Sequence, residues 1–448
     1  MPRAPRVWPR RSARAAMGSV GSCWRETCHF RQVLNPAMGS PGGLIPEPAP
    51  AAWPSVHVYT LPARFNADLT HDQLTFEKSY QVEQIVHRQL ERLSVPPARA
   101  RLFFVPVYAT AYFHAQFRTG ASREEATNAT RAFVSDAIRH VAATSRSAWA
   151  RAARARGDSA PLGRDHVIVW AHDFGRCWLA PSEAARAIGI QITGDPRPGD
   201  GQWGGAQLPA DAVGEAEPDA EADGADRGAD APAGAPCFAR AWDIVVPPLL
   251  DGGDDDVGGG APAPSGAAPL AVFRGRCARL ERGYSFGVRQ ALWRDFGARS
   301  SGAVRLTDGG ADDRNDAEYQ SELSSAPFCL APPGHARWSA RAYEAVRAGC
   351  VPVLFETETD EAIEYPWQAQ GLNYSRFSLV VGAGRVGGLA AQLRAAAPRH
   401  AQLRAALLAE ARPALLWSHA GGGGPFDRLM VELGRRADEI AVSSSSNS

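Results

Sequence analysis

Residues 326–355 read APFCLAPPGHARWSARAYEAVRAGCVPVLF, and this stretch decides the fold class. Short apolar runs at 328–330 and 351–355 predict two strands that are buried on both faces of a sheet. The Pro-Pro-Gly loop between them leads into a predicted helix that opens at Ser339. A strand, a crossover helix and a strand form a parallel βαβ unit, and such units bind ligands at the carboxyl ends of their strands. The stretch therefore predicts an α/β fold with a ligand site at the loop.

The start of this predicted helix suits a nucleotide diphosphate. The first backbone N–H groups of a helix and its macrodipole attract phosphate. Arg341 lies in the first turn and can bind phosphate oxygens, and Glu344 on the same helix can accept hydrogen bonds from ribose hydroxyls. An ordinary helix with a capping Ser339 and a solvated Arg and Glu would show the same residues, so this segment alone leaves both interpretations open.

Length and composition bound the class of protein. At 448 residues the chain is too long for one typical core, which favours two domains. Lys+Arg and Asp+Glu both number 48, so the charge balance indicates no nucleic-acid partner. Nearly all of the basic charge is arginine, with Lys78 as the single lysine, and this bias weakens each arginine as a sign of function. No run approaches the roughly 18 apolar residues of a membrane span.

Apolar strand patterns recur in two groups along the chain. Runs at 102–107 and 166–171 belong to the first group, and a fresh α/β pattern begins at 270. Two stretches rich in Ala, Asp and Gly interrupt the pattern and have the composition of disorder. The predicted segments are a disordered or targeting segment at 1–50, a first α/β domain at 51–250 with a low-complexity insertion at 195–236, a disordered linker at 251–269, a second α/β domain at 270–440 and a disordered tail at 441–448. Two Rossmann-like domains that face each other across a cleft are the layout of the GT-B type of fold.

The first fifty residues leave the cellular compartment open. They carry five arginines before residue 15 and no acidic residue before Glu26, and they lack the apolar h-region of a secretory signal. An Arg-rich, acid-poor start resembles an organelle transit peptide, and a disordered or truncated N-terminus fits equally well.

The seven cysteines show no CxxC pair, so a zinc site is not expected. Cys329 and Cys350 lie in apolar runs and are predicted to be small core residues. Cys177 and Cys237 could pair in an oxidising compartment, which the sequence leaves open.

Two acidic runs, at 254–256 and 312–313, could be mistaken for a metal-binding Asp-x-Asp motif. Metal-binding carboxylates must be held in place, whereas these runs lie in Gly-rich loops where carboxylates are solvated. We therefore predict no obligatory metal and no other cofactor.

Several longer blocks follow one another in a fixed order. They are VYTLPARFNADL at 58–69, YQVEQIVHRQL at 80–90, ARLFFVPVY at 100–108, HVIVWAHDFGRC at 166–177, DIVVPP at 243–248, LAVFRGR at 270–276 and the stretch at 326–355. In these blocks the chain resembles the exostosin-like glycosyltransferases of the GT47 type, a family with many plant and algal cell-wall members. The likeness covers most of residues 56–426 outside the two interrupting stretches.

The resemblance implies a GT-B fold and an inverting transfer of a hexosyl or pentosyl group. The donor would be a nucleotide sugar, expected to be a UDP-sugar, and the acceptor a hydroxyl of a glycan or glycoprotein. It also implies residence in the Golgi lumen or at its membrane. The usual N-terminal membrane anchor of the family is not evident here, and this departure puts Golgi residence in question.

The donor site implied by the resemblance lies in the stretch that opens this section. Ser339, Arg341 and Glu344 match the S-x-R-x-x-E-A pattern of the family. Arg341 would offset the charge that develops on the UDP leaving group, and Glu344 would accept hydrogen bonds from ribose or sugar hydroxyls. Gly334 would let the loop backbone approach the phosphates closely. The alternatives are a helix-surface ion pair and an ordinary turn glycine. The large Trp338 before the helix start departs from the family pattern and bears on donor choice.

Two further arginines are candidates for the donor side. Arg274 ends a predicted buried strand next to Gly275, a position suited to a diphosphate, although the abundance of arginine weakens the inference. Arg289 lies in the helix that follows, and a solvated helix face is the favoured interpretation for it.

His172 and Asp173 follow directly after the predicted strand at 166–171 and are candidates for the catalytic base. An inverting transfer needs a group that takes the proton from the attacking hydroxyl, and His or Asp can serve. Either residue could instead tie down a loop by hydrogen bonds. Tyr80 also matches the family pattern and could shape the acceptor side or hold the first domain together.

Two other classes of function remain open from the sequence. The first is a catalytically inactive, exostosin-like protein that binds carbohydrate or acts as a scaffold. The second, suggested only by the N-terminus, is a cytosolic or plastid nucleotide-binding enzyme of another kind. The expected partners of the favoured function are a nucleotide-sugar donor and a glycan acceptor, with no nucleic acid, and membrane association is left open.

Overall fold

The computed structural model describes residues 53–69, 80–146, 148–149, 162–196, 237–250, 269–278, 280, 283–297, 302–309, 316–357, 362–417 and 423–445. All of them belong to one compact unit, Glu47–Ser448. The segment predicted at 1–50, the insertion predicted at 195–236 and the linker predicted at 251–269 lie outside the described residues, except for positions 195, 196 and 269.

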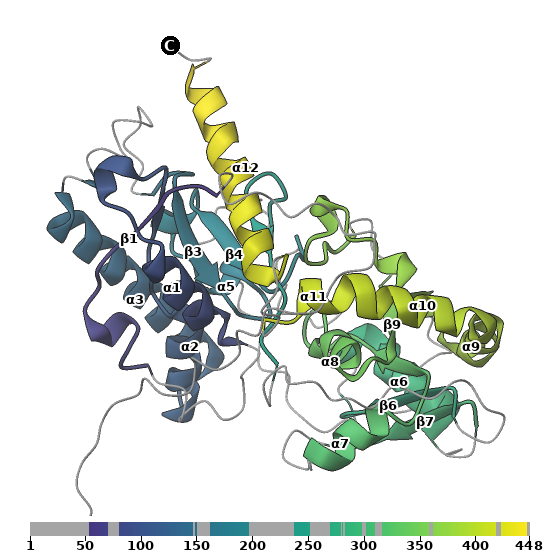
Figure 1. The fold of residues 1–448 in the computed structure, drawn as a ribbon. Coiled ribbons are helices and arrows are strands. Elements are labelled where there is room, and N and C mark those ends of the chain that lie inside the picture. Colours follow the sequence, from purple (N-terminus) through teal and green to yellow (C-terminus); the bar gives the residue numbers. More distant parts are fainter. Residues whose placement is uncertain are drawn as a thin grey trace, which may run out of the picture. The chain divides into compact units, whose positions relative to one another are not determined.

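The first half of this unit forms a parallel five-stranded sheet of order β1-β2-β3-β4-β5. Its strands are β1 (Val56–Val58), β2 (Leu102–Phe104), β3 (His166–Trp170), β4 (Ile188–Gln191) and β5 (Ile244–Val245). Its helices are α1 (Val82–Arg92), α2 (Ala109–Arg118), α3 (Arg123–Thr144) and α5 (Arg176–Leu179), drawn in purple to teal in Figure 1. The runs predicted at 102–107 and 166–171 form β2 and β3, and both strands are buried along their whole length.

The second half forms another parallel five-stranded sheet, of order β10-β9-β8-β6-β7. Its strands are β6 (Ala271–Arg274), β7 (Val304–Thr307), β8 (Phe328–Ala331), β9 (Val351–Glu356) and β10 (Leu379–Gly382). Its helices are α6 (Val288–Leu292), α7 (Asp316–Leu323), α8 (Ala340–Ala348), α9 (Leu389–Ala396), α10 (His400–Ala406) and α11 (Arg412–Leu415). The predicted βαβ unit is confirmed as β8, α8 and β9.

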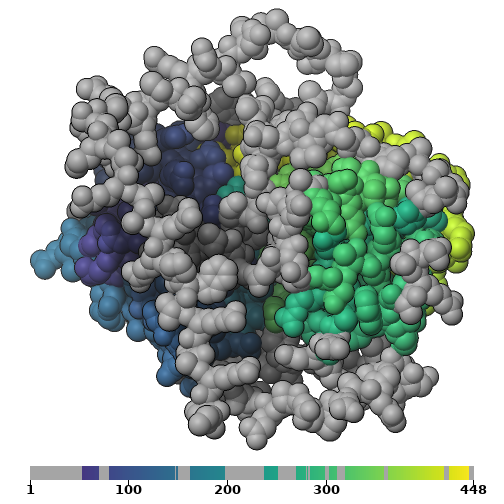
Figure 2. All heavy atoms as spheres, turned by 90° about the horizontal axis from the view of Figure 1, so that it is seen from below, coloured from purple at the N-terminus to yellow at the C-terminus, as the bar shows by residue number. Residues whose placement is uncertain are grey.

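The strand order of the second sheet reverses between β6 and β8. After β7 the chain returns to the other side of β6 as β8, and such a reversal opens a crevice beyond the carboxyl ends of the two strands. The loop after β8 and the start of α8 therefore lie where an α/β sheet binds its ligands. The predicted α/β architecture of two Rossmann-like sheets is confirmed, and Figure 2 shows the two halves as separately coloured regions.

The last helix, α12 (Pro425–Ser445), packs against the first half of the unit, close to β4 in Figure 1. Arg436 Nη2 donates to the carbonyl oxygen of Asp243 at 3.0 Å, and Arg101 Nη2 pairs with Asp438 Oδ1 at 2.6 Å. The sequence assigned α12 to the second domain, because its helical pattern does not show which half it covers. The disordered tail predicted from 441 also differs from the structure, in which α12 continues to its end at Ser445.

Two disulfide bonds link four of the five described cysteines, and the fifth, Cys277, is a free buried thiol. Cys177 pairs with Cys237, as the sequence allowed, and Cys329 pairs with Cys350. Cys329 and Cys350 are buried in the core as predicted, and the bond between them was not anticipated. The two residues lie next to each other because β8 and β9 are paired, with Cα atoms 5.8 Å apart, and sequence spacing does not reveal that neighbourhood.

Candidate active site

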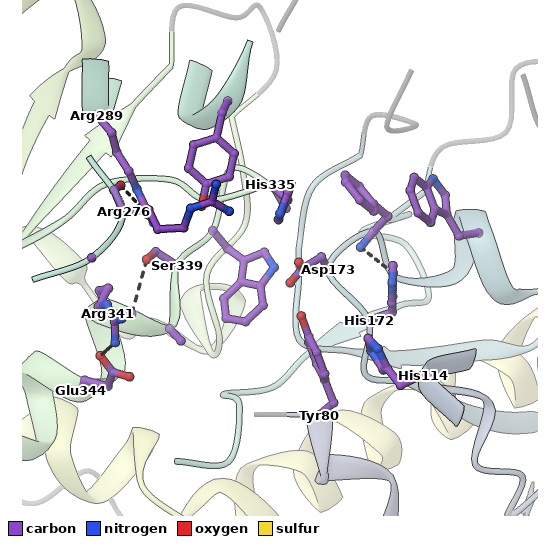
Figure 3. Close-up of a pocket in the computed structure, with 18 of the residues that line it drawn as sticks. Tyr80, His114, His172, Asp173, Arg276, Arg289, His335, Ser339, Arg341 and Glu344 are labelled. Atoms are coloured by element: carbon purple, nitrogen blue, oxygen red, sulfur yellow. Dashed lines mark hydrogen bonds and ion pairs between the residues drawn. The ribbon is translucent and has the colours of Figure 1, made fainter. Parts of the chain in front are cut away.

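A cavity of about 540 Å³ lies between the carboxyl-terminal side of the first sheet and the crevice of the second. Figure 3 shows its two walls, one from each half of the unit. The first half contributes Tyr80, Phe113, His114, Phe117, Arg123, His172, Asp173, Phe174, Trp178 and Leu250. The second half contributes Gly275, Arg276, Tyr284, Arg289, Gly309, Gly334, His335, Ala336, Trp338, Ser339, Ala340, Arg341 and Glu344. The cavity thus contains all but one of the predicted site residues.

Arg341 and Glu344 form an ion pair at the start of α8. Arg341 Nη1 lies 2.5 Å from Glu344 Oε2 and donates to the hydroxyl of Tyr319 at 3.1 Å, and Tyr319 also donates to Glu344. Burial disfavours the charged guanidinium, but Glu344 and Tyr319 outweigh this cost and raise the pKa of Arg341. Ser339 caps the helix, with its Oγ accepting from the backbone N–H of Arg341 at 3.3 Å. The pair lines the cavity rather than an open helix surface.

The loop before α8 is held by hydrogen bonds from α6 and from the turn before α6. The carbonyl of Pro333 accepts from Ser285 Oγ at 2.7 Å and from Arg289 Nε at 3.0 Å. A Cβ placed on Gly334 would meet only Arg289 Nη2 at 3.8 Å and Tyr284 OH at 3.9 Å, which are ordinary contacts. The packing of the protein itself therefore does not require glycine at 334. Its bare backbone instead leaves room on the cavity side.

Arg289 lines the cavity and is only 8% exposed. Its Nη1 donates to the carbonyl of Arg276 at 3.3 Å, and its guanidinium lies 5.1 Å from the rings of Phe273 and Tyr284. Burial lowers the pKa of Arg289 from its ordinary value. The favoured sequence interpretation, a solvated helix face, is wrong, because α6 turns this side towards the loop after β8.

Arg274 is not brought to the cavity. Its Nε donates to Glu322 at 2.6 Å and its Nη2 donates to Glu318 at 2.8 Å, so α7 takes up its guanidinium. Arg276, two residues further along the chain, lines the cavity in its place. The sequence could not separate these two arginines, since the acids that bind Arg274 lie more than 40 residues away.

His172 and Asp173 both line the cavity, directly after β3. The Nδ1 atom of His172 accepts from the backbone N–H of Phe174 at 3.2 Å, which places the imidazole proton on Nε2. Burial holds the pKa of His172 well below its ordinary value, with added effects of His114, Arg123 and His335. A neutral imidazole with both nitrogens used in this way is a poor base. The carboxylate of Asp173, near the middle of the cavity in Figure 3, fits that role better.

The sequence missed several residues of this cavity, among them His114, Arg123 and His335. Tyr80, which the sequence offered for the acceptor side, lines the cavity and stacks on His114 with ring centroids 5.0 Å apart, and its ring centroid lies 6.3 Å from that of His172. His335, in the loop before α8, has its pKa lowered to about 4 by burial and by the nearby Arg123 and other arginines. His335 could have been found from its place after Gly334, whereas His114 and Arg123 carry no local motif.

Among the described residues, no group of three or more His, Cys, Asp or Glu side chains could hold a metal ion. No helix in that part of the chain is long and apolar enough to cross a membrane. That the function needs no obligatory metal stays a prediction from the sequence.

The two facing parallel sheets, with a charged helix start on one wall, define the GT-B class of fold. The family model of the exostosin GT47 domain matches residues 52–218 and 241–395. The chain belongs to the exostosin GT47 family.

Individual relatives agree with this family. A probable glucuronoxylan glucuronosyltransferase of Arabidopsis thaliana is 26% identical over 67% of this chain and 58% of its own length. A probable glucuronosyltransferase of Oryza sativa subsp. japonica is 29% identical over 71% of this chain and 65% of its own length. A probable beta-1,4-xylosyltransferase of Arabidopsis thaliana is 34% identical over 20% of each chain. The chain thus spans 58% and 65% of the first two relatives. The crystal structure of TarM matches with a TM-score of 0.29 at 8% identity over 61% of this chain and 55% of that one.

Proposed function

We propose that this chain is an inverting glycosyltransferase that moves a sugar from a UDP-sugar to a hydroxyl of a glycan. The observation that carries the proposal is the division of the cavity. The Arg341–Glu344 pair at the start of α8 lies on one wall, and Asp173 lies on the other. The names of the relatives favour a glucuronosyl group as the sugar and a β-1,4-linked xylan chain as the acceptor.

In this proposal the second half of the unit holds the donor. The backbone N–H groups at the start of α8 and the guanidinium groups of Arg276, Arg289 and Arg341 surround the diphosphate. Glu344 accepts hydrogen bonds from hydroxyls of the ribose or the sugar. Because hydrogen bonds hold the guanidinium groups of Arg289 and Arg341 before the donor arrives, these two groups stabilise the charge that develops on UDP as it leaves.

The transfer is a single displacement. Asp173 takes the proton from the acceptor hydroxyl while its oxygen attacks the anomeric carbon of the sugar. The bond between that carbon and the β-phosphate oxygen breaks on the opposite side, and UDP departs with the electron pair. Attack opposite to the leaving group inverts the anomeric configuration. No step requires a metal ion, because arginines carry the charge compensation.

We place this activity in an oxidising compartment, expected to be the Golgi lumen. The support is the presence of two disulfide bonds, Cys177–Cys237 and Cys329–Cys350, since such bonds persist outside the cytosol. A tagged full-length chain that localised to the cytosol or a plastid would contradict this assignment.

Calorimetry with UDP tests the donor side. The variants Arg341→Ala and Glu344→Gln should each weaken UDP binding about 10- to 100-fold, as expected for the loss of hydrogen bonds to charged groups. Arg274→Ala is the matched control, because this arginine also forms ion pairs in the second half but does not line the cavity. Thermal unfolding of each variant checks that the fold persists. Wild-type affinity in both cavity variants would refute the donor assignment.

A catalytically inactive relative would bind UDP equally well, so binding alone does not exclude it. Transfer of labelled glucuronic acid from its UDP donor to xylohexaose distinguishes the two cases. Transfer by the wild type, lost in Asp173→Asn with UDP binding intact, supports the enzyme. Binding of UDP without transfer to any glycan tested would favour the inactive protein.

A further inference from the structure

Phe117, Phe174 and Trp178 form an aromatic patch on the wall of the cavity that belongs to the first half. The rings of Phe174 and Trp178 are stacked, with centroids 4.3 Å apart and an interplanar angle of 23°. Phe117 is 39% exposed, and among the large apolar side chains that are exposed in the described part of the chain it is the one that lines the cavity. Phe174 and Trp178 are half-buried. Aromatic rings left open in a cavity indicate a binding surface.

The backbone beneath this patch is tightly fixed at Gly175. Its φ is +54°, and a Cβ there would lie 1.8 Å from Gln191 Oε1, so no other residue fits. The same Gln191 oxygen accepts from the backbone N–H of Arg176 at 3.0 Å. The guanidinium of Arg176 forms a buried ion pair with Asp243 at 2.9 Å. Phe174 therefore projects from a rigid turn rather than from a mobile loop.

The other end of the turn is fixed as well. Cys177 is bonded to Cys237, and Arg131 Nη2 donates to the carbonyl of Cys177 at 3.1 Å. Arg131 Nε donates to the carbonyl of Trp178 at 3.0 Å. The backbone of Trp178 is thus held by these hydrogen bonds and the neighbouring disulfide, while its ring stays partly open to the cavity. Such support under an exposed side chain is what a pre-organised binding site requires.

The chemistry of the patch fits a sugar ring better than a nucleotide diphosphate. The C–H faces of a pyranose ring pack on flat aromatic surfaces, whereas phosphates need the positive charge found on the opposite wall. Arg123 lies with its guanidinium over the ring of Trp178, 5.3 Å from the ring centroid. It brings hydrogen-bond donors for hydroxyl groups next to the rings of the patch.

We propose that the aromatic patch is a subsite for a pyranose ring of the acceptor chain. This ring lies beyond the one whose hydroxyl meets Asp173. The inference rests on the proposed function, since it assumes that the opposite wall holds the UDP-sugar. It predicts that the patch contributes to binding of long acceptors and contributes nothing to binding of UDP.

The test compares leucine variants by calorimetry with xylohexaose, xylobiose and UDP. Phe174→Leu and Trp178→Leu keep an apolar side chain but remove the flat ring. Both should weaken xylohexaose binding about 3- to 10-fold, the size expected for an aromatic stacking contact, and change xylobiose and UDP binding little. Trp178→Phe, which keeps a ring, should recover most of the affinity.

Phe133→Leu is the matched control. Phe133 lies on α3 and stacks on Tyr112 of α2 with centroids 4.0 Å apart, but this pair does not line the cavity. The control should bind all three ligands as the wild type does.

The outcomes separate this inference from the proposed function. Wild-type xylohexaose affinity in both leucine variants would overturn the subsite, and so would an equal loss of xylobiose or UDP binding. A wild type that binds UDP but not xylohexaose would overturn the choice of occupant. A wild type that binds no UDP would overturn the proposed function, and this inference with it.

Discussion

The two walls of the cavity differ in how the chain builds them. The charged wall, formed by Arg276, Arg289, Arg341 and Glu344, surrounds one loop and one helix start. The opposite wall collects rings and polar groups from Tyr80 before α1, from α2, from α3 and from the turn after β3 with α5, and remote contacts hold that turn in place. The comparison teaches that one local motif supplies Gly334, Ser339, Arg341 and Glu344 of the proposed donor wall, whereas the proposed acceptor wall is assembled by the fold.

Among variants that test the difference between the two walls, Asp173→Asn is expected to have the largest effect on the rate of transfer. Loss of the base should reduce the rate of transfer about 10²- to 10⁴-fold, while UDP binds as before. Radiolabelled transfer and calorimetry measure the two quantities on the same sample. His172→Gln should reduce the rate much less, because the Nδ1 atom of His172 is already used by the N–H of Phe174. A larger loss in the histidine variant would reverse the assignment of the base.

Each wall of the cavity can be destabilised separately, because one disulfide bond lies in each half: Cys177–Cys237 in the first and Cys329–Cys350 in the second. The double variant Cys177→Ser with Cys237→Ser should lower the free energy of unfolding by about 2–4 kcal/mol and weaken xylohexaose binding more than UDP binding. Cys329→Ser with Cys350→Ser should lower stability similarly but affect UDP more, because β8 and β9 flank α8. Urea unfolding and calorimetry provide both readouts. Equal effects of the two pairs on both ligands would show that the walls are not independent.

Glu83 provides a pH-dependent test of the first wall. It is buried, and it accepts from the backbone N–H groups of Thr110 at 2.8 Å and Ala111 at 3.3 Å, at the start of α2. Burial raises the pKa of Glu83 from 4.5 to about 8. Between these values the folded state holds a proton that the unfolded chain has lost, so this contribution to stability falls as the pH rises.

Glu83→Gln removes this titration. We expect the free energy of unfolding of the wild type, relative to the variant, to fall by about 1–4 kcal/mol between pH 5 and pH 8. Urea unfolding at several pH values measures the difference. A difference that is constant with pH would mean that Glu83 does not hold its proton in the folded state.

The smallest effect on stability is expected at Gly334. Gly334→Ala should change the free energy of unfolding by no more than about 0.5 kcal/mol, since the added methyl group meets only ordinary contacts. It should nevertheless weaken UDP binding about 2- to 10-fold by occupying space on the cavity side. Thermal unfolding and calorimetry test the two parts. Unchanged UDP affinity would leave Gly334 as an ordinary turn residue.

The parts of the fold that could be predicted are those with local signals. The βαβ unit at 326–355 was predicted and is present. The capping box of α3, formed by Ser122 and Glu125, is another local pattern that the structure contains. Helix α2 was missed, because Tyr108 before it provides no side-chain cap. Its first N–H groups are instead bound by Glu83 from α1, and no local sequence pattern reveals such a partner. Strand β4 was missed because its four residues include a glycine.

The candidate site divides in the same way. Gly334, Ser339, Arg341 and Glu344 came from one motif, and the structure brings all four to the cavity. Side chains whose surroundings depend on distant elements could not be placed. Arg274, turned towards α7, and the residues of the aromatic patch are the examples.

The most direct test of the central claim is a crystal structure with bound UDP. The account predicts the diphosphate at the start of α8, beside Gly334 and Arg341, with Glu344 near the ribose or the sugar position. It also predicts that Asp173 faces the open side of the β-phosphate. UDP bound against Phe174 and Trp178, or outside the cavity altogether, would contradict the assignment of the two walls.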